Sequence, residues 1–227
     1  MAQNIAWERE YKKPTFLTKK NEPQQDVVRF VRFLKKEGIS IENSVVVDLG
    51  SGTGRNSNYL AELGAKMYGI EISKTAVTQA EKEAKEKGLT VSYYTQSMSD
   101  HIPVGTAGAT IIIDITSSNS LSETERASYC NEIQRILKPG GFLFVKALAK
   151  DGDQNAKNLL KKFPGKEKDT YVMPETGIIE RVFSREDFLG VYKNFISIFL
   201  EKKTSYSRFG NQPYRRNFWI AYFQKRI

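Results

Sequence analysis

Short runs of apolar residues alternate with longer amphipathic stretches over the first two thirds of the chain. Continuous apolar runs bounded by turn residues are typical of strands that are buried on both faces of a parallel sheet. Amphipathic stretches with apolar residues at helical spacing are typical of helices that cover such a sheet. The alternation therefore predicts an α/β fold. Strands are expected over residues 45–49, 66–70, 89–95, 108–115 and 142–148.

Residues that are typical of helix starts and helix ends stand at the limits of the amphipathic stretches. Pro23 suits the first turn of a helix, and Gly38 follows the last apolar residue of that stretch. Ser122 and Glu125 have the spacing of a capping box, in which each side chain satisfies a backbone N–H of the other residue. Helices are expected over residues 24–38, 55–64, 74–87 (capped by Ser73) and 122–141.

The last third of the chain departs from this alternation. Residues 149–182 carry no regular pattern, and they follow the fifth strand, so they should emerge at the carboxyl ends of the strands. A short helix capped at Ser184 comes next. Two long segments rich in aromatic and β-branched residues, 196–207 and 214–226, then predict an antiparallel hairpin.

A glycine-rich turn follows the first strand. Asp48 and Leu49 end that strand, and glycines stand at positions 50, 52 and 54. Glycine lets the backbone turn sharply and lets a ligand approach where a Cβ atom would block it. A dinucleotide fingerprint would place its third glycine at position 55, where Arg55 stands, so a nicotinamide-linked oxidoreductase is disfavoured. The remaining alternative to a nucleotide site is an ordinary connection between a strand and a helix.

The order of Asp48, the three glycines and Glu71 resembles the first motifs of the class I S-adenosylmethionine-dependent methyltransferases. In that family the acid and the glycine turn surround the methionine end of the cofactor. An acid at the position of Glu71 accepts hydrogen bonds from both ribose hydroxyls, which suits an acceptor-only carboxylate. The resemblance implies cofactor-binding residues at Asp48, Gly50, Ser51, Gly52, Gly54, Glu71, Ile72, Ser97, Met98 and Asp114.

The same resemblance implies the architecture and the reaction. The expected fold is a seven-stranded, mostly parallel, doubly wound sheet of order 3-2-1-4-5-7-6, with an antiparallel seventh strand. The expected reaction is a methyl transfer that uses S-adenosylmethionine as cofactor and leaves S-adenosylhomocysteine as product. A non-catalytic protein that binds the cofactor with the same fold stays open as an alternative.

The adenine end of the site departs from the family pattern. Related enzymes often carry an aspartate after the third strand and a Leu-Pro pair a few residues later. If Ile102-Pro103 corresponds to that pair, Ser97 occupies the aspartate position and can still accept a bond from the adenine amine. With a shifted register Asp100 takes that place, and both alternatives stay open.

Asp114 ends the fourth strand, and a small polar loop, residues 116–120, follows it. Ligands in open α/β sheets bind beyond the carboxyl ends of the strands, so this region should lie beside the transferable methyl group. Asp114 is the first candidate to orient the acceptor or take its proton, and Asn119 and Tyr11 are further candidates. The alternative for Asp114 is a cap of the loop. The loop lacks the (D/N)PP(Y/F) sequence that grips exocyclic amino groups, which disfavours their methylation by that route.

Trp7 and Tyr11 are spaced as in the N-terminal cover segment of the thiopurine and tellurite-resistance methyltransferases, the small-molecule branch of the family. There the segment folds over the cofactor, whereas the alternative is a loose arm anchored by two aromatic rings. Residues 1–22 are therefore expected to be mobile without a ligand. One domain is expected, with a cover arm and helix (1–40), a cofactor-binding core (41–148), a substrate-side insertion (149–182) and a C-terminal helix and hairpin (183–227).

The net charge of +9 lies mostly in residues 151–227, which contribute +6. Five basic and three aromatic residues, without an acid, lie between Lys202 and Arg216. Arginine forks bind carboxylate or phosphate, and aromatic rings stack on planar groups. The turn suits a small anionic acceptor held by Arg208, Arg215 or Arg216, or a nucleic acid or protein substrate; a charged edge hairpin is the third alternative. A small-molecule acceptor is favoured, because the chain has no separate RNA-binding module.

The cysteine and histidine content and the lengths of the apolar runs exclude several kinds of protein. Cys130 is the only cysteine and His101 the only histidine, so no disulfide within the chain and no metal site are expected. The chain has no run of about 18 apolar residues and no apolar N-terminal segment, so no transmembrane span and no secretory signal are expected. A cytoplasmic protein is the default expectation, and the sequence makes no prediction of the oligomeric state.

Overall fold

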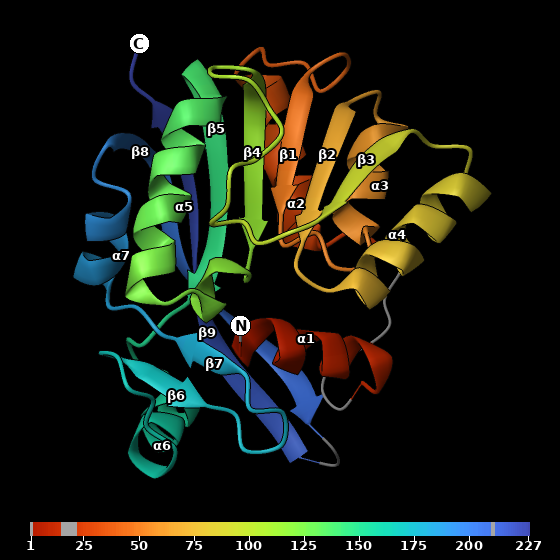
Figure 1. Cartoon of the computed structure of the whole chain (residues 1–227). Coiled ribbons are helices and arrows are strands. Elements are labelled where there is room, and N and C mark those ends of the chain that lie inside the picture. The colour runs from red at the N-terminus through yellow and green to blue at the C-terminus, as the bar shows by residue number, and fades with distance from the viewer. Residues whose placement is uncertain (1, 15–21, 210–211) are drawn as a thin grey trace.

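The structure, a computed structural model, describes residues 2–14, 22–209 and 212–227. Its centre is a seven-stranded sheet of order β3-β2-β1-β4-β5-β9-β8, in which β9 runs antiparallel to both neighbours (Figure 1). This order confirms the predicted sheet, with β8 and β9 as its sixth and seventh strands. The strands are β1 (Val45–Leu49), β2 (Lys66–Glu71), β3 (Val91–Thr95), β4 (Ala109–Ile115), β5 (Leu137–Leu148), β8 (Phe195–Phe209) and β9 (Gln212–Lys225).

Helices pack on both faces of the sheet, because residues that alternate along each strand point to opposite sides. Phe30 of α2 packs with Val46 on one face, and Tyr129 of α5 packs with Val47 on the other. α3 shares the face of α2, α7 shares the face of α5, and α4 lies along the edge strand β3. These helices confirm the predicted ones: α2 (Gln25–Lys36), α3 (Arg55–Glu62), α4 (Lys74–Glu86), α5 (Glu123–Ile136) and α7 (Arg185–Val191).

The predicted helix caps are present. The Ser73 hydroxyl accepts a bond from the backbone N–H of Ala76 at the start of α4. Ser122 and Glu125 form the reciprocal capping box at the start of α5. α5 nevertheless ends at Ile136 rather than at 141, because Leu137 already pairs with Ala109 as the first residue of β5.

Several elements below the sheet are not among the predicted ones. The helix α1 (Ala2–Lys12) lies across the carboxyl ends of the parallel strands, toward which the arrowheads of β1, β2 and β4 point (Figure 1). Residues 149–182 contain α6 (Gln154–Lys162) and a two-stranded sheet of β6 (Thr170–Val172) and β7 (Ile179–Arg181). A single 3₁₀ turn, η1 (Ser118–Ser120), follows β4. The expected irregular insertion is thus a small folded unit beside the ends of the strands.

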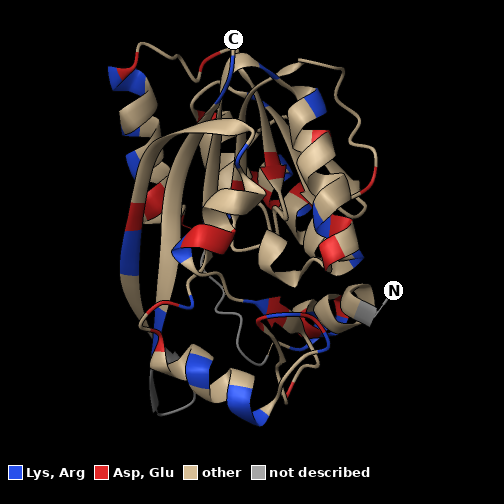
Figure 2. Cartoon of the chain, turned by 90° about the vertical axis from the view of Figure 1, so that its left-hand side faces the viewer, with Lys and Arg blue, Asp and Glu red and all other residues tan. Residues whose placement is uncertain are grey.

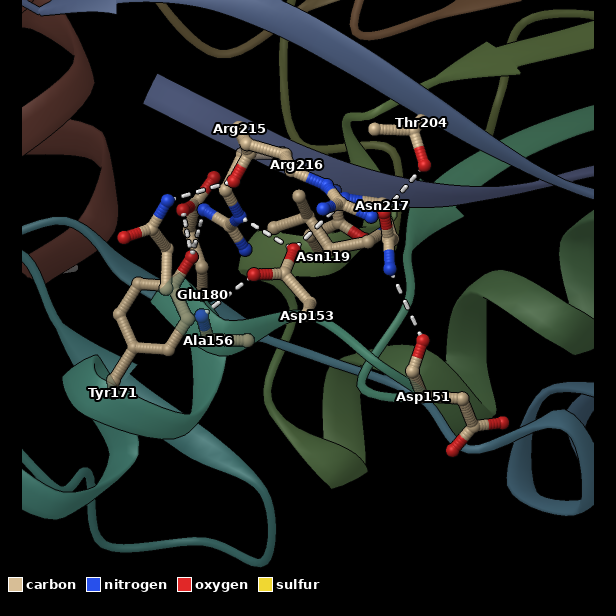
Figure 3. Close-up of polar contacts among 12 residues, drawn as sticks. Asn119, Asp151, Asp153, Ala156, Tyr171, Glu180, Thr204, Arg215, Arg216 and Asn217 are labelled. Atoms are coloured by element: carbon tan, nitrogen blue, oxygen red, sulfur yellow. Dashed lines mark hydrogen bonds and ion pairs between the residues drawn. The ribbon is translucent and has the colours of Figure 1, made fainter. Parts of the chain in front are cut away.

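A buried polar network joins this insertion to β9 (Figure 3). The Asp153 carboxylate accepts bonds from Arg216 Nε at 3.0 Å and from the backbone N–H of Asn217 at 2.8 Å. It also caps α6 by accepting a bond from the N–H of Ala156 at 2.8 Å. Arg216 donates further to the Tyr171 hydroxyl, 2.9 Å away, so β6 is held as well. The insertion therefore has a fixed position relative to the sheet.

Part of the excess positive charge of the C-terminal third lies on the surface of this insertion. Figure 2 shows blue bands along α6, where Lys157, Lys161 and Lys162 are exposed. No helix in the described part of the chain is long and apolar enough to cross a membrane.

Candidate functional site

A cavity lies between the carboxyl ends of β1, β2 and β4 and the helix α1. It contains about 970 Å³ of empty space, part of which is open to solvent. Two of its walls come from the glycine turn after β1 and from the loop after β4. Of the residues predicted to bind the cofactor, it is lined by Gly50, Ser51, Gly52, Glu71, Ile72, Ser97 and Met98.

The glycine turn approaches other parts of the cavity wall closely. Gly50 has a φ of +75°, and a Cβ atom built on it would lie 2.2 Å from the Ser117 hydroxyl oxygen. Gly52 has a φ of +56°, and a Cβ there would lie 2.8 Å from the Tyr11 hydroxyl oxygen. A side chain at either position would therefore be strained and would crowd the cavity wall. The conformation and the space both require glycine.

Glu71 stands at the tip of β2 and faces the cavity. One carboxylate oxygen accepts the backbone N–H of Gly52 at 3.0 Å, and the other accepts that of Ser73 at 2.8 Å. Burial raises the pKa of this carboxyl, while the backbone bonds act to lower it. The backbone N–H of Ile72 also acts on this carboxylate, which keeps lone-pair capacity for a hydroxyl donor of a ligand.

The structure places Asp48 and Gly54 behind the cavity wall rather than on it. Asp48 is buried and accepts a bond from the Ser57 hydroxyl at 2.7 Å. Burial raises its pKa to about 7. Gly54 precedes α3 with a φ of +85°, and a Cβ there would lie 2.3 Å from the Tyr93 hydroxyl oxygen. Both residues shape the turn from the protein side.

Asp114 is not among the described residues of the cavity lining, and the structure places it in the wall behind the loop after β4. One carboxylate oxygen accepts the backbone N–H groups of Ser117 and Ser118, at 3.1 and 3.2 Å. The other accepts the Tyr129 hydroxyl at 2.8 Å, and the residue is fully buried. Burial also raises the pKa of Asp114. These contacts match the alternative in which Asp114 caps the loop after β4.

Asn119 likewise has a structural position. Its amide nitrogen donates to the Thr116 carbonyl at 3.3 Å, and its amide oxygen accepts the N–H of Leu148 at 3.1 Å. The residue is 1% exposed and is absent from the described cavity lining. Asn119 ties η1 to the end of β5 and does not present a free polar group to an acceptor.

Tyr11 is the candidate catalytic residue that does line the cavity, together with Trp7 on the same helix. Their ring centroids are 6.2 Å apart. The Gln3 amide fixes the start of α1 by donating to the Ile179 carbonyl at 2.7 Å and accepting the N–H of Ile179 at 3.2 Å. The Arg9 guanidinium donates to the Thr176 carbonyl. The insertion therefore supports one side of the cover.

The other side of α1 is held by Glu8 at the start of α4. Its carboxylate accepts bonds from the Ser73 hydroxyl at 2.7 Å and from the Thr75 hydroxyl at 2.6 Å. Burial acts to raise the pKa of Glu8, but these bonds and the backbone N–H of Thr75 lower it to about 2. The contact suits the positive end of the α4 dipole. α1 thus connects α4 with the insertion and closes the side of the cavity that lies opposite the sheet.

The two residues that could contact the adenine amine, Ser97 and Asp100, lie in different positions. Ser97 lines the cavity, and its hydroxyl lies 2.8 Å from that of Ser99. Asp100 is exposed and is not among the described residues of the lining. The geometry therefore favours Ser97 over Asp100 for a ligand in this cavity.

Two of the basic residues between Lys202 and Arg216 are paired with acids. Arg216 points inward to Asp153 and is only 6% exposed. Lys203 pairs with the buried Asp26 at 2.5 Å. The side chain of Arg208 lies outside the described ones, and Arg215 is exposed. In the described part of the chain, no three His, Cys, Asp or Glu side chains cluster closely enough to hold a metal ion.

The cavity lining also includes residues that were not predicted to bind a ligand, among them Arg55, Asn56 and Gln24. Arg55 and Asn56 begin α3 directly after the glycine turn, and Gln24 immediately precedes α2. In the sequence, Arg55 served only to reject a dinucleotide fingerprint. Its charge next to a phosphate- or carboxylate-binding type of turn was the signal that could have identified it.

Comparison with known proteins gives the following matches. The family described as "Methyltransferase domain" matches residues 46–141. A ubiquinone biosynthesis O-methyltransferase from Actinobacillus pleuropneumoniae serotype 7 (strain AP76) is 26% identical over 118 residues, which make up 51% of this chain and 50% of that protein. The chain spans about half the length of these curated relatives, which include two further ubiquinone biosynthesis O-methyltransferases.

Solved structures share the fold over more of the chain. A S-adenosylmethionine-dependent methyltransferase from Methanosarcina mazei has a TM-score of 0.72 and 24% identity, covering 82% of this chain and 94% of that one. The 1,6-didemethyltoxoflavin-N1-methyltransferase of Burkholderia thailandensis, whose structure holds 1,6-didemethyltoxoflavin and S-adenosylhomocysteine, has a TM-score of 0.65 and 15% identity. That match covers 90% of this chain and 78% of the other. Residues 46–141, which contain the glycine turn and Glu71, therefore match the methyltransferase domain family, and the strand order of the sheet is that of the class I S-adenosylmethionine-dependent methyltransferase fold.

Proposed function

We propose that this protein transfers the methyl group of S-adenosylmethionine to a small-molecule acceptor that binds between α1 and the carboxyl ends of the parallel strands. The observation that carries the proposal is the covered cavity, which lies between the glycine turn and a helix fixed on two sides. Concave, partly apolar cavities of this size suit small ligands, whereas RNA needs an open basic groove. The inward-facing Arg216 and the paired Lys203 reduce the basic surface that such a groove would use.

The residues of the cavity fit the proposed cofactor. The absence of a Cβ atom at Gly50 and Gly52 leaves room for a ligand against the backbone, and Glu71 offers carboxylate oxygens to a ribose diol. Ile72, Ser97 and Met98 would line the space for the base. When bound, the cofactor would supply a methyl group on a positively charged sulfur. The acceptor atom would bond to the methyl carbon as the carbon–sulfur bond breaks, and S-adenosylhomocysteine would leave.

The protein's own contribution would be to position the acceptor and exclude water. Because the methyl group is already activated, correct positioning can supply much of the rate enhancement. α1 would exclude water once both ligands are bound. Tyr11 is the proposed residue closest to this chemistry. Burial raises its pKa well above the ordinary value, so its hydroxyl stays protonated and can donate a hydrogen bond that orients a ligand.

The position of each segment around the cavity suggests its role. Residues 41–148 would bind the cofactor, residues 1–40 and 149–182 would cover the acceptor, and residues 183–227 would complete the sheet. Small-molecule chemistry is consistent with the named relatives. One is named for ubiquinone biosynthesis, and the structure of another holds 1,6-didemethyltoxoflavin.

A radioactive methyl-transfer assay tests this function. The purified protein is incubated with S-adenosylmethionine labelled in the methyl group and with a cell extract divided into small molecules, RNA and protein. Label should enter the small-molecule fraction, and production of S-adenosylhomocysteine should rise with it. Glu71→Ala serves as the matched control, because at a cofactor concentration below saturation it should lower the signal in every fraction. Label that enters RNA or protein, and is released by ribonuclease or protease, would contradict a small-molecule acceptor.

A further inference from the structure

The face of α1 that lines the cavity extends from the glycine turn to the loop after β4. Gln3, Trp7 and Tyr11 lie four residues apart on this helix, so they share one face, and all three line the cavity. The Tyr11 hydroxyl oxygen lies 2.8 Å from the position that a Cβ atom of Gly52 would take. The Gln3 amide nitrogen donates to the Ser120 carbonyl at 3.2 Å. With a rise of about 1.5 Å per residue, these two ends of the cavity lie about 12 Å apart along the helix axis.

The end of the cavity at Gln3 is built from the loop after β4 and the start of α5. Leu121 and Glu125 line it. The Arg126 guanidinium holds this segment by donating to the carbonyls of Ser118 and Leu121, both at 2.7 Å. These bonds fix the shape of the wall that lies farthest along α1 from the glycine turn. This part of the cavity is here called the Gln3 end, and it consists of Gln3, Ser120, Leu121 and Glu125.

Glu125 gives the Gln3 end a negative charge. One carboxylate oxygen, Oε2, closes the capping box of α5 by accepting the backbone N–H of Ser122 at 2.8 Å and its hydroxyl at 2.7 Å. The other oxygen, Oε1, accepts no bond from a described residue. The other charged residues of the described lining stand elsewhere, because Arg55 follows the glycine turn and Glu71 ends β2. Since an ionised carboxylate only accepts hydrogen bonds, the Gln3 end suits a ligand that donates one.

The Ser120 hydroxyl is a second group of the Gln3 end that lacks a partner. Its oxygen is buried and has no hydrogen-bond partner among the described residues. Buried hydroxyl groups are usually paired, so an unpaired one in a cavity wall indicates a polar group of a ligand. Trp7 and Leu121 add apolar surface to the same cavity. The combination suits a small molecule with an apolar body and a few polar groups.

We propose that the acceptor is a hydroxyl or amino compound rather than an anion, and that Glu125 binds its O–H or N–H group and takes the proton. The inference rests on the proposed function and names its substrate class. The acceptor oxygen or nitrogen would use its electron pair to bond to the methyl carbon, while the pair of the breaking carbon–sulfur bond stays on sulfur. The acceptor's proton would pass to Glu125 Oε1 and then to solvent. An anionic acceptor would instead meet the carboxylate as a like charge in a partly buried site.

Removal of acids from the substrate pool tests the charge of the acceptor. The small-molecule fraction of the cell extract is passed through a strong anion-exchange resin near neutral pH, which retains carboxylates and phosphates. The flow-through and the salt eluate are each assayed with labelled S-adenosylmethionine. The methyl-accepting activity should appear in the flow-through, and activity confined to the eluate would overturn the assignment. Label that enters only RNA or protein would reject the proposed function itself, which is a separate outcome.

Glu125→Gln tests the role of the carboxylate, because the amide oxygen can still accept the N–H of Ser122 and keep the cap. At limiting flow-through acceptor, its rate of methyl transfer should fall about a hundredfold, which is within the range for loss of a general base. Its affinity for S-adenosylhomocysteine should stay within about twofold of the wild type, because the change lies outside the cofactor site.

Asp187→Asn is the matched control. Asp187 stands in the same position after Ser184, the cap of α7, and is not among the described residues of the cavity lining. This variant should transfer methyl groups as fast as the wild type. An unchanged rate in Glu125→Gln, an equal loss in Asp187→Asn, or a loss that is matched by weaker binding of S-adenosylhomocysteine would overturn the role of Glu125.

Discussion

The floor of the cavity, residues 48–73, and its cover, α1 with residues 149–182, are held together over very different distances along the chain. In the floor, Asp48 meets Ser57 nine residues away, and Gly52 meets Glu71 nineteen residues away. In the cover, Gln3 meets Ile179 across 176 residues. The floor is thus built by one strand-turn-helix-strand unit, from β1 to β2, whereas the cover exists only after distant segments meet. The comparison indicates that the floor keeps its shape through local backbone geometry and that the cover depends on a few polar anchors.

The largest expected effect comes from the anchor of the cover. Asp153→Ala should leave the Arg216 guanidinium buried without its carboxylate and should remove the cap of α6. Removal of one partner of a buried ion pair costs about 3–5 kcal/mol, so the free energy of unfolding should fall by roughly that amount. Urea unfolding measures the loss, and hydrogen exchange should locate it in residues 154–182.

Asp151→Ala is the matched control for this anchor. Its carboxylate accepts one exposed bond, from the N–H of Arg185, so its removal should cost less than about 1 kcal/mol. Similar losses of stability in the two variants would show that the buried network does not hold the insertion.

Alanine variants of two glycines with similar φ values distinguish the cost of backbone strain from the cost of steric crowding in the floor. Gly50 and Gly38 have φ values of +75° and +74°, but a Cβ atom at Gly38 would meet nothing within 4 Å. Both alanine variants should lose about 1–2 kcal/mol of stability from the left-handed backbone. Gly50→Ala should lose about 1–3 kcal/mol more through overlap with Ser117. Thermal unfolding measures the stability of both variants. Equal losses would show that the loop after β4 moves away from the added methyl group without destabilising the protein.

The buried Asp48 gives the floor a pH dependence that the cover does not share. Burial raises its folded pKa from 3.8 to about 7, so the folded state binds more protons than the unfolded state between about pH 4 and pH 7. Stability from this group is therefore present at low pH and is lost as the pH rises through 7. The loss between pH 5 and pH 7.5 should be about 2–3 kcal/mol.

Asp48→Asn isolates this effect, because an amide oxygen can still accept the Ser57 hydroxyl but does not titrate. Urea unfolding of both proteins at the two pH values, without ligand, should show a wild-type deficit that grows with pH. Parallel pH profiles would mean that Asp48 is ionised in the folded protein throughout this range.

A smaller effect sharpens the account of the cover. Glu8→Ala removes the carboxylate that accepts the hydroxyls of Ser73 and Thr75, and it should free one side of α1 at a cost of about 1–2 kcal/mol. Hydrogen exchange of residues 2–12 should become faster, and S-adenosylhomocysteine should restore part of the protection. Asn4→Ala, at an exposed position of α1, is the control. If ligand leaves the exchange of the wild-type helix unchanged, α1 is a fixed part of the structure rather than a cover that responds to ligand.

The contrast between floor and cover also explains what the sequence could predict. The strand order, the glycine turn and the position of Glu71 follow from local patterns, because apolar runs, glycines and caps act over a few residues. α1 was missed because its sequence carries almost no apolar stripe and it is held mainly by polar partners far along the chain. The same holds for Arg216, whose inward direction depends on Asp153.

Asp114 shows a different limit. Its place at the end of β4 was predicted correctly, but position on a strand does not fix the direction in which a side chain finds its partners. The Tyr129 hydroxyl from α5 and the N–H groups of η1 take both carboxylate oxygens. Arg55 was overlooked for the opposite reason. Its neighbours in sequence identified the turn, but only the fold shows that Arg55 lines the cavity and has no ion-pair partner among the described residues.

The central claim is that the floor binds S-adenosylmethionine through the glycine turn and Glu71, and calorimetry tests it most directly. S-adenosylhomocysteine and NAD are titrated separately into the wild type and Glu71→Ala, with folding checked by circular dichroism. The account predicts that S-adenosylhomocysteine binds the wild type at one site and that NAD does not bind. It also predicts that Glu71→Ala loses about 1.5–3 kcal/mol, or roughly tenfold to hundredfold in affinity. Binding of NAD, or unchanged affinity for S-adenosylhomocysteine in a folded Glu71→Ala protein, would contradict it.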